Sequence, residues 1–466
     1  MKTNMKKFLS ILLAGGMILS LGGCGNDEPT TEPSSREPVV SAASSSEDDS
    51  KVNSDSETDT DIVGTLDKPT AVNLSEKDEE KINYGINRFN AELFKREFEK
   101  REDKSDNVFL SPLSVYTALS VLDNGAAGET RSELNALLGG IYPDGKSSGN
   151  PVELDKLNSY FGNYIKGLGG ENTKFNMANS VWVMKRDDVK LNDVFGNNIS
   201  EFYSAEIFNE DADKAVGSIN SWVSDKTDKM IRQILTDGDI SNDTVEVLLN
   251  AVAFDGKWKK EYEKDDVRED TFNNYDGSKS KVDFMYSTED YYFSDDNAKG
   301  FIKDYQSDGD KQYSFVGVLP NEDIGIDEYV KKYFDDSTIN DYVENSISAD
   351  VETSLPKFSF DTKYTLNGTL EDMGMNKSFS PSEADFTNIA EANNKIYVSK
   401  VFHKAHIEVD EKGTKAAAVT AIIMEDNCIM TDENEVYEVY LDRPFLFAIY
   451  DRQEKMPLFI GTVCSL

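Results

Sequence analysis

The stretch that decides the fold reads Asp410-Glu-Lys-Gly-Thr-Lys-Ala-Ala-Ala-Val-Thr-Ala-Ile-Ile423. A strand-like pattern at residues 405–409 precedes it, and the next strand-like run begins only near Val436. The connection is therefore far longer than the usual loop of about 4 to 6 residues. It contains no proline and one glycine, Gly413, and small and β-branched residues of this kind suit a buried strand. Its composition is that of a strand without a place in a sheet.

Two other interpretations of this stretch remain open on composition alone. Alanine favours helix, so a short surface helix is one alternative. A mobile surface loop is the other.

The overall composition limits the class of protein. The chain has 466 residues, of which 38% are hydrophobic and 11% aromatic, enough for a sizeable core. Its 87 acidic residues against 49 basic ones give a formal charge of −38, which repels phosphate backbones and anionic bilayers over a Debye length of about 8 Å. We therefore expect no nucleic-acid partner, and the charge itself serves the solubility of an exported protein.

Groups suited to bond chemistry are scarce. The three cysteines, Cys24, Cys428 and Cys464, have neither the spacing of a metal site nor that of a disulfide framework. Of the two histidines, His403 is flanked by apolar residues and has no Ser/His/Asp arrangement around it, and His406 reads as an ordinary strand or surface residue. The sequence therefore predicts no enzyme, no metal and no cofactor.

The N-terminus predicts export and lipid attachment. Residues 1–7 are positively charged, residues 8–21 form an apolar run, and Leu21-Gly-Gly-Cys24 follows. This order is typical of a secretory signal, and small residues before one cysteine resemble the bacterial lipobox. We expect residues 1–23 to be the signal peptide and Cys24 to carry the lipid; an ordinary signal peptide with an incidental cysteine is the alternative.

Residues 24–74 predict an acidic, disordered linker. Residues 25–71 are rich in Ser, Thr, Pro, Asp and Glu and cannot bury enough surface to offset their ordering entropy. As a flexible chain they would reach roughly 35 to 40 Å. No later stretch is apolar over a bilayer-spanning length. We expect a cell-surface, extracellular lipoprotein that meets the membrane only through its lipid.

Residues 75–466 read as one folded α+β domain. Ser75 is suited to cap a helix whose apolar positions begin at Ile82, and Ser111-Pro112 starts another helix after a short strand at residues 108–110. The helix that starts at Ser111-Pro112 is expected to run to about residue 122. Further helices are expected from the turn at residues 125–128 through 138, and within 216–234. Strand-like runs follow at 180–184, 245–254, 313–319, 351–360, 395–402, 405–409, 436–441 and 445–451. Helices first and long strands later favour large antiparallel or mixed sheets in one domain.

The opening stretch resembles the reactive-loop hinge of the serpins, and the similarity extends from about Ser75 to Leu466. The matching signatures include Asn107-Val-Phe-Leu-Ser-Pro-Leu-Ser114, Gly125-Ala-Ala-Gly-Glu-Thr130, Asn220-Ser-Trp-Val-Ser-Asp-Lys-Thr227, Leu249-Asn-Ala-Val-Ala-Phe-Asp-Gly-Lys-Trp258, Leu355-Pro-Lys-Phe358, Ala384-Asp-Phe386, Val401-Phe-His-Lys404, Asp442-Arg-Pro-Phe-Leu-Phe447 and Pro457-Leu-Phe-Ile-Gly461. The resemblance implies a helix cluster with a large central β-sheet, further sheets and an exposed reactive-centre loop.

The same resemblance implies a monomeric suicide substrate of a serine protease. In serpins the native fold is metastable, and the cleaved loop enters the central sheet while the protease is still bound as an acyl-enzyme. The implied hinge residues are Glu411, Gly413, Thr414, Ala416, Ala417 and Ala418. Serpins commonly have Glu where this chain has Lys415, a difference that is tolerable if this side chain faces solvent.

Resemblance also assigns a sheet-opening cluster, which consists of Ser111, Ser114, Asn250, Trp258 and His403. In this assignment His403 bonds to Ser111, Ser114 and Asn250 beneath the sheet, while Trp258 and Glu411 lie near the point where insertion starts. None of these residues is expected to take part in bond chemistry.

The position of the scissile bond follows from the usual hinge length, which places it at Asn427-Cys428. The chain from there to Asp442 is longer than the common pattern, so the residue before the bond can also be Met424, Asp426, Cys428 or Met430. Residues 416–441 contain no Lys or Arg, which disfavours trypsin-like targets. We expect elastase-like or subtilisin-like targets, with cysteine proteases as a cross-class alternative. A non-inhibitory surface binding protein of the same fold is the alternative function.

Overall fold

The computed structural model describes residues 71–143, 149–240, 244–414 and 436–466. The predicted signal peptide, Cys24, Ala416, Ala417, Ala418, Asn427 and Cys428 lie outside these ranges. The helices are α1 (Glu76–Lys100), α2 (Pro112–Gly125), α3 (Gly128–Leu138), α4 (Leu154–Tyr164), α5 (Asp193–Tyr203), α6 (Ala212–Lys226), α7 (Ile326–Lys332), α8 (Thr338–Glu344) and α9 (Asn367–Asp372), with short 3-10 turns η1 (Ile165–Gly167), η2 (Lys264–Asp266) and η3 (Lys377–Phe379).

Within the described residues the strands form three sheets. They are β1 (Val108–Leu110), β2 (Thr173–Met184), β3 (Lys190–Leu191), β4 (Glu206–Glu210), β5 (Glu246–Lys257), β6 (Val267–Asn273), β7 (Lys279–Ser294), β8 (Ala298–Asp304), β9 (Tyr313–Pro320), β10 (Ile347–Pro356), β11 (Phe358–Thr365), β12 (Ala390–Glu391), β13 (Val398–Val409), β14 (Gly413–Thr414), β15 (Tyr437–Tyr440), β16 (Phe445–Asp451) and β17 (Met456–Val463). One sheet has the order β11-β13-β14-β5-β2-β4, a second runs β1-β17-β16-β9-β8-β7-β10-β15 with β6 on β7, and β3 pairs with β12. These mixed sheets confirm the predicted α+β class.

Helix α1 begins where the sequence predicts. The Ser75 hydroxyl accepts a hydrogen bond from the Asp78 N–H (3.3 Å), and the Asp78 carboxylate accepts one from the Ser75 N–H (3.1 Å). This capping box satisfies backbone donors that have no partner within the helix. Ile82, Ile86 and Phe89 then lie on the buried face of the helix.

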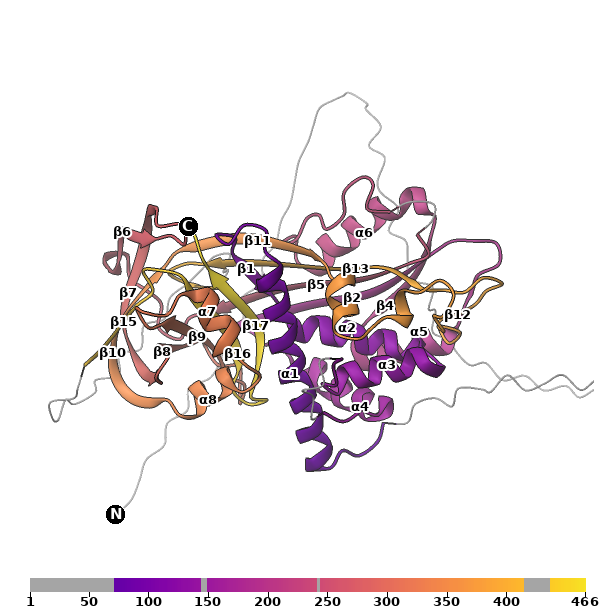
Figure 1. Ribbon diagram of the computed structural model, residues 1–466, viewed down its shortest axis with the longest axis horizontal. Helices are drawn as coiled ribbons and strands as arrows, with labels where there is room; N and C mark the ends of the chain where they lie inside the picture. The colour runs from indigo at the N-terminus through magenta and orange to yellow at the C-terminus, as the bar shows by residue number, and fades with distance from the viewer. Residues whose placement is uncertain (1–70, 144–148, 241–243, 415–435) are drawn as a thin grey trace, which may run out of the picture. The chain divides into compact units, whose positions relative to one another are not determined.

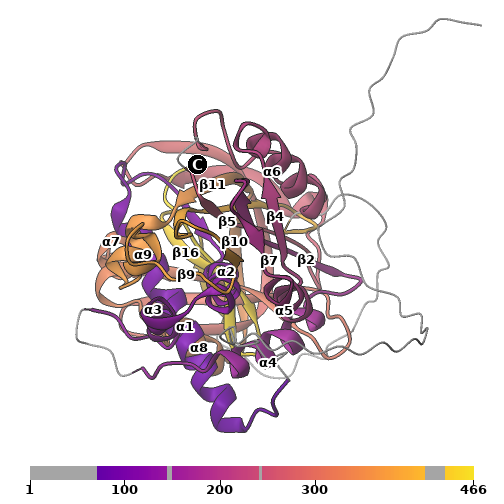
Figure 2. The ribbon, with the colours of Figure 1, turned by 90° about the vertical axis from the view of Figure 1, so that its right-hand side faces the viewer.

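The six-stranded sheet separates two apolar cores. Helix α6 packs on one face, where Ile219 and Val223 meet Trp182 and Leu249. Helices α2 to α5 cover the other face. The larger core lies between these helices and the sheet, and it includes Leu248 and neighbouring strand residues. Figures 1 and 2 show α6 and the α2–α5 group on opposite sides of this sheet. Because both faces are covered, nine consecutive residues of β5 are buried.

Three predicted element boundaries are wrong. The run at residues 351–360 is two strands, β10 and β11, which separate at Lys357 and belong to different sheets. The runs at 395–402 and 405–409 are one strand, β13, because residues 403 and 404 continue the pairing with β5. Helix α6 ends at Lys226, well before residue 234, and the chain then takes left-handed backbone angles at Asp228 and Lys229.

In the part of the chain that is described, no helix is long and apolar enough to cross a membrane.

Candidate functional site

In the six-stranded sheet, β13 and β5 pair directly over most of their length and are separated at one end, which we call the open end of the sheet. β13 and β5 pair directly and in parallel from the Val398–Glu246 pair to the His406–Ala253 pair. Beyond this point β14 lies between them, with Gly413 opposite Lys257 and Thr414 opposite both Gly256 and Val409. β14 is antiparallel to both neighbours. Two residues of the predicted hinge, Gly413 and Thr414, therefore already lie within the sheet.

A tight reversal leads the chain from β13 into β14. The Asp410 carboxylate accepts hydrogen bonds from the Lys412 N–H (2.8 Å) and the Gly413 N–H (3.2 Å), as aspartate commonly does in turns. The Asp410 N–H donates to the Gly413 carbonyl (3.0 Å). A Cβ on Gly413 would lie 2.0 Å from the Gly256 carbonyl oxygen, so only glycine fits between the strands at this position.

Thr414 is the last described residue before the gap in the loop, and it is 1% exposed. Its hydroxyl and the Tyr305 hydroxyl are 2.6 Å apart, within hydrogen-bond distance. Tyr305 is itself fully buried, which raises the pKa of its phenol, and its ring stacks on Trp258 with centroids 4.5 Å apart. The polar side chain of Thr414 thus has a partner inside the core.

Trp258 and Tyr262 hold the backbone of the turn. The Trp258 indole N–H donates to the Asp410 carbonyl, and the Trp258 backbone N–H donates to the Lys412 carbonyl, both at 2.9 Å. The Tyr262 N–H donates to the Glu411 carbonyl at the same distance. Consecutive carbonyls of the predicted hinge are therefore fixed by one segment of chain.

A buried ion pair supports these two aromatic rings. The Lys303 ammonium lies 2.7 Å from the Glu289 carboxylate and 4.2 Å from the centroid of the Tyr262 ring. It also lies 5.5 Å from the Trp258 ring. Lys303 is 1% exposed, so its charge is compensated by Glu289 and by the ring faces instead of by water.

Glu411 joins the hinge to the point where β10 passes into β11. Its carboxylate lies 2.6 Å from the Lys357 ammonium, and both side chains are about one-third exposed. The hydrogen bond from Lys357 is the main cause that lowers the pKa of Glu411, and the same bond raises the pKa of Lys357. The Lys357 N–H also donates to the Asp283 carbonyl (2.8 Å), so the pair links the hinge to the second sheet.

Four of the predicted cluster residues meet beneath the closed part of the sheet. The His403 Nε2 accepts a hydrogen bond from the Ser111 N–H (3.1 Å), which places the ring proton on Nδ1, 2.5 Å from the Asn250 Oδ1. Asn250 donates to the Ser114 carbonyl (2.9 Å), to its hydroxyl (2.5 Å) and to Asn179 (2.7 Å). Burial lowers the pKa of His403 to about 3, so the ring is neutral.

This network joins the two strands that the loop would have to separate. His403 lies in β13 opposite Asn250 in β5, so their side-chain bond reinforces the backbone pairing. Ser111 caps α2, and its hydroxyl donates to the Leu458 carbonyl (2.6 Å), which anchors the network to the helix and to β17. Neither ring nitrogen of His403 faces a hydroxyl, which is the arrangement of a structural residue and not of a general base.

The structure does not bring Trp258 to these four residues. Trp258 follows the end of β5, eight residues beyond Asn250. At about 3.3 Å per residue this separation is roughly 26 Å. Trp258 belongs instead with Glu411 at the open end of the sheet. His406 pairs with Asp361 at 2.8 Å.

Four residues at the open end were not predicted from the sequence: Lys357, Tyr305, Tyr262 and Lys303. Lys357 lies inside the signature Leu355-Pro-Lys-Phe358, so the signature could have singled out this residue, but it does not indicate the ion-pair partner. Tyr305 and Lys303 lie in no motif, and more than 100 residues separate each of them from the turn.

Comparison with known proteins identifies the family. The family model described as "Serpin (serine protease inhibitor)" matches residues 84–466. An uncharacterized serpin-like protein of Methanosarcina acetivorans is 30% identical over 82% of this chain and 88% of its own length. Serpin-Z7 of Hordeum vulgare is 32% identical over 78% of this chain and 91% of its own.

Solved structures agree with this match. The native state of tengpin, a thermophilic serpin, aligns with a TM-score of 0.74 and 38% identity, over 85% of this chain and 96% of that chain. Serpins are generally protease inhibitors and not enzymes. The chain belongs to the serpin family.

Proposed function

We propose that this protein inhibits a protease as a suicide substrate and traps it as an acyl-enzyme by inserting its cleaved loop between β5 and β13. One observation carries the proposal: Gly413 and Thr414 already lie between these strands at one end, while β5 and β13 still pair directly from Val398–Glu246 to His406–Ala253.

The energetic direction follows from the pairing. Continued insertion past Thr414 breaks one ladder, between β13 and β5, and forms two, one on each side of the new strand. The net gain in backbone hydrogen bonds, at about 0.5 to 1.5 kcal/mol each, and the burial of small side chains favour the inserted state. Intact, the loop is held at both ends, by β14 and by β15. Cleavage removes this restraint.

The predicted scissile bond fits a long displacement. Residues 414–427 number 14 and would form a strand of roughly 45 Å at about 3.3 Å per residue. A protease bound covalently through the acyl bond would be carried over this distance, and distortion of its active site would prevent water from completing deacylation. Ala416, Ala417 and Ala418 are small enough to enter without obstruction.

The targets and location belong to the same proposal. The absence of Lys and Arg from residues 416–441 supports elastase-like or subtilisin-like targets, with cysteine proteases as a cross-class alternative. The residues before Cys24 support lipid attachment and display on the outer surface of a cell. We propose that the displayed protein is a monomer.

Incubation with a panel of such proteases tests the proposal. An SDS-stable complex with the mass of the protease plus the N-terminal part of the inhibitor is expected, and mass spectrometry of the released C-terminal fragment locates the cleaved bond. Active-site-blocked protease is the control and should give no complex. Clean cleavage without complex by every protease in the panel would contradict the inhibitory function and favour a non-inhibitory binding protein.

A further inference from the structure

The buried ion pair of Lys303 and Glu289 lies beside the open end of the sheet and belongs to none of the family signatures. Lys303 lies on β8 and is 1% exposed, and Glu289 lies on β7 and is 7% exposed. The Lys303 Nζ is 2.7 Å from the Glu289 Oε1, which also accepts a hydrogen bond from the Ser287 hydroxyl (2.5 Å). Taking two charges out of water is costly, so a pair at this depth needs a physical explanation.

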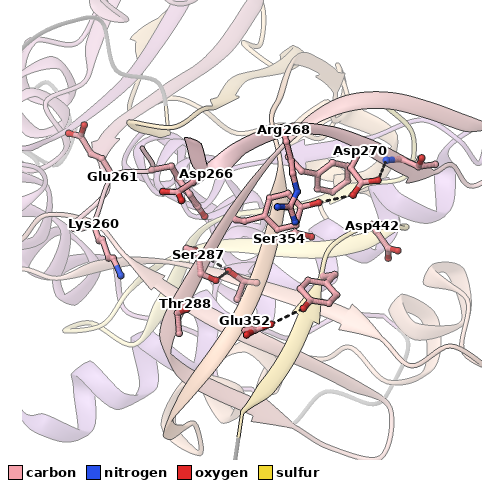
Figure 3. A pocket seen from close by; sticks show the side chains of 16 residues that line it. Lys260, Glu261, Asp266, Arg268, Asp270, Ser287, Thr288, Glu352, Ser354 and Asp442 are labelled. Atoms are coloured by element: carbon pink, nitrogen blue, oxygen red, sulfur yellow. Dashed lines mark hydrogen bonds between the residues drawn. The ribbon is translucent and has the colours of Figure 1, made fainter. Parts of the chain in front are cut away.

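The pair lies behind the wall of a pocket of about 710 Å³. Ser287 and Tyr262 are among the residues that line this pocket, and Figure 3 shows Ser287 on its wall. Both residues also contact the pair, Ser287 through its hydroxyl and Tyr262 through its ring. The charges of Lys303 and Glu289 are therefore compensated by protein groups and not by water.

The Lys303 ammonium lies against two aromatic rings. It is 4.2 Å from the centroid of the Tyr262 ring and 5.5 Å from the centroid of the Trp258 ring. A cation is attracted to the face of such a ring, and more strongly where both are shielded from water. Since Glu289 fixes the ammonium, the ammonium in turn restricts the orientation of both rings.

These rings belong to the residues that hold the hinge turn. Trp258 donates its indole N–H to the Asp410 carbonyl and its backbone N–H to the Lys412 carbonyl, each at 2.9 Å. Tyr262 donates its backbone N–H to the Glu411 carbonyl at the same distance. A shift of either residue is therefore passed to three consecutive carbonyls just before β14.

A second route leads from the pair to β14 itself. Tyr305 follows Lys303 by two residues, so the two side chains lie on the same side of the extended chain. The Tyr305 ring stacks on Trp258 with centroids 4.5 Å apart, and its hydroxyl lies 2.6 Å from the Thr414 hydroxyl. Lys303 and Tyr305 thus both restrict Trp258, and Tyr305 also contacts the strand that has entered the sheet.

Stability alone does not explain the ion pair. Two apolar residues of similar volume often give equal or greater stability than a buried ion pair, whereas a charged pair can favour one particular arrangement of its surroundings. Here that arrangement is the orientation of the two rings and, through them, of the hinge turn.

We propose that Lys303 and Glu289 are positioning residues for the trapping reaction, which keep the two rings oriented so that β14 stays between β5 and β13. The inference rests on the proposed function, because β14 is the start of the strand that would be inserted. Without the pair, the turn would leave its carbonyl contacts more often, and insertion would then begin from an unpaired chain.

Hydrogen exchange tests the positioning directly. The double variant Lys303→Met with Glu289→Gln removes both charges together, keeps the side-chain lengths and leaves an acceptor for Ser287. The amides of Trp258 and Tyr262 should exchange about tenfold faster than in the wild type, an effect of the size that loss of a buried cation–π contact permits. The amides of α1 should exchange at the wild-type rate.

The stoichiometry of inhibition tests the effect on trapping. For a protease that the wild type traps, the double variant should consume about twice as many inhibitor molecules per protease, because insertion that starts later competes less well with deacylation. The midpoint of denaturant unfolding should stay close to the wild-type value, since both members of the pair are removed together.

The ion pair of Arg101 and Asp327 supplies a matched control. The Arg101 side chain is 4% exposed, its Nη2 lies 2.6 Å from the Asp327 Oδ1, and its guanidinium lies 3.6 Å from the centroid of the Phe98 ring. Arg101→Met with Asp327→Asn removes this pair. Amide exchange at Trp258 and Tyr262 and the stoichiometry of inhibition should keep their wild-type values, even where the unfolding midpoint falls.

A milder variant keeps the inference testable if the double variant does not fold. Ser287→Ala removes one hydrogen bond to Glu289 and should raise the exchange rates of the Trp258 and Tyr262 amides by a smaller factor. Unchanged exchange at these two amides, in whichever of the two variants folds, would overturn the inference.

The other contrary results have distinct meanings. A lower unfolding midpoint with unchanged stoichiometry would show that the pair only stabilises the fold, and an equal rise in stoichiometry in the control would show that the effect is not specific to the hinge. Either result overturns the inference alone. A wild type that forms no complex with any protease would overturn the proposed function, while hydrogen exchange would still decide whether the pair positions the turn.

Discussion

The Glu411 carboxylate and the Lys357 ammonium are 2.6 Å apart and connect the start of the hinge to the junction of the two large sheets. Both groups are partly exposed, so the pair contributes about 0.2 to 1 kcal/mol to stability. Its importance lies in its position, because it holds the turn that precedes β14.

Replacing Glu411 by Gln should therefore change the rate of conversion to an inserted form more than it changes the free energy of unfolding. We expect the native form to convert faster, on heating, to an inserted form that no longer inhibits, with a small change in unfolding midpoint. Loss of inhibitory activity with time at elevated temperature measures this. Glu408→Gln, on β13 outside the turn, is the control. Equal rates for wild type and Glu411→Gln would show that the ion pair does not restrain the hinge.

The Thr414 side chain supplies a test of insertion. Arginine at this position would have to be buried beside Tyr305 without a counter-charge, at a cost of several kcal/mol. The intact Thr414→Arg protein can fold with this residue outside the sheet, and cleavage should then release the protease in place of trapping it. Thr414→Ser keeps the hydroxyl and should inhibit normally. The measurement is the stoichiometry of inhibition, and wild-type values for Thr414→Arg would refute insertion at this point.

His403 predicts an acid dependence of stability. Burial lowers its pKa to about 3, against an ordinary value near 6.5 in the unfolded chain. Between these values the unfolded chain binds the extra proton, so the free energy of unfolding falls as the pH drops from about 6.5 towards 3. The slope for one proton is about 1.4 kcal/mol per pH unit. Denaturant unfolding of the uncleaved protein across this range should show a shallower slope for His403→Gln than for wild type.

Glu246 predicts the opposite dependence at higher pH. It lies at the first position of β5, opposite Val398, and neither carboxylate oxygen has a partner among the residues that the structure describes. Burial raises its pKa to about 8, so the folded state holds a proton that the unfolded chain loses near pH 4.5. Its stabilising contribution is complete below that pH and is lost as the pH rises through 8. Glu246→Gln should be less sensitive to pH between 5 and 9 than wild type; identical profiles would contradict the assignment.

Local signals explain why some elements were predictable. Ser75 and Ser111 cap their helices through contacts within three residues, so the sequence alone contains the whole motif. The division at Lys357 was missed because residues 351–360 have continuous strand character, and the change of sheet depends on distant strands. The predicted unpartnered strand is present only as Gly413 and Thr414 within the described residues, and the fate of residues 415–435 stays a prediction.

The functional contacts divide in the same way. The bonds of His403, Asn250, Ser111 and Ser114 were expected only through resemblance, since these residues are far apart in the sequence and carry no joint pattern. The position of Trp258 near the turn was likewise expected only through resemblance to the family. Tyr305 and Lys303 could not be assigned, because a buried tyrosine or lysine resembles any other until its partner is known.

The two residues of β14 have a kinetic consequence for the proposed trap. A new strand is slow to start, because its first pairs fix the chain before later pairs compensate for the lost entropy. Here the first pairs exist in the intact protein, so the proposed insertion after cleavage would be the elongation of a strand that has already started. The outcome would then depend on the rate of strand elongation relative to the rate of deacylation. Elongation would proceed one residue at a time, starting at Thr414.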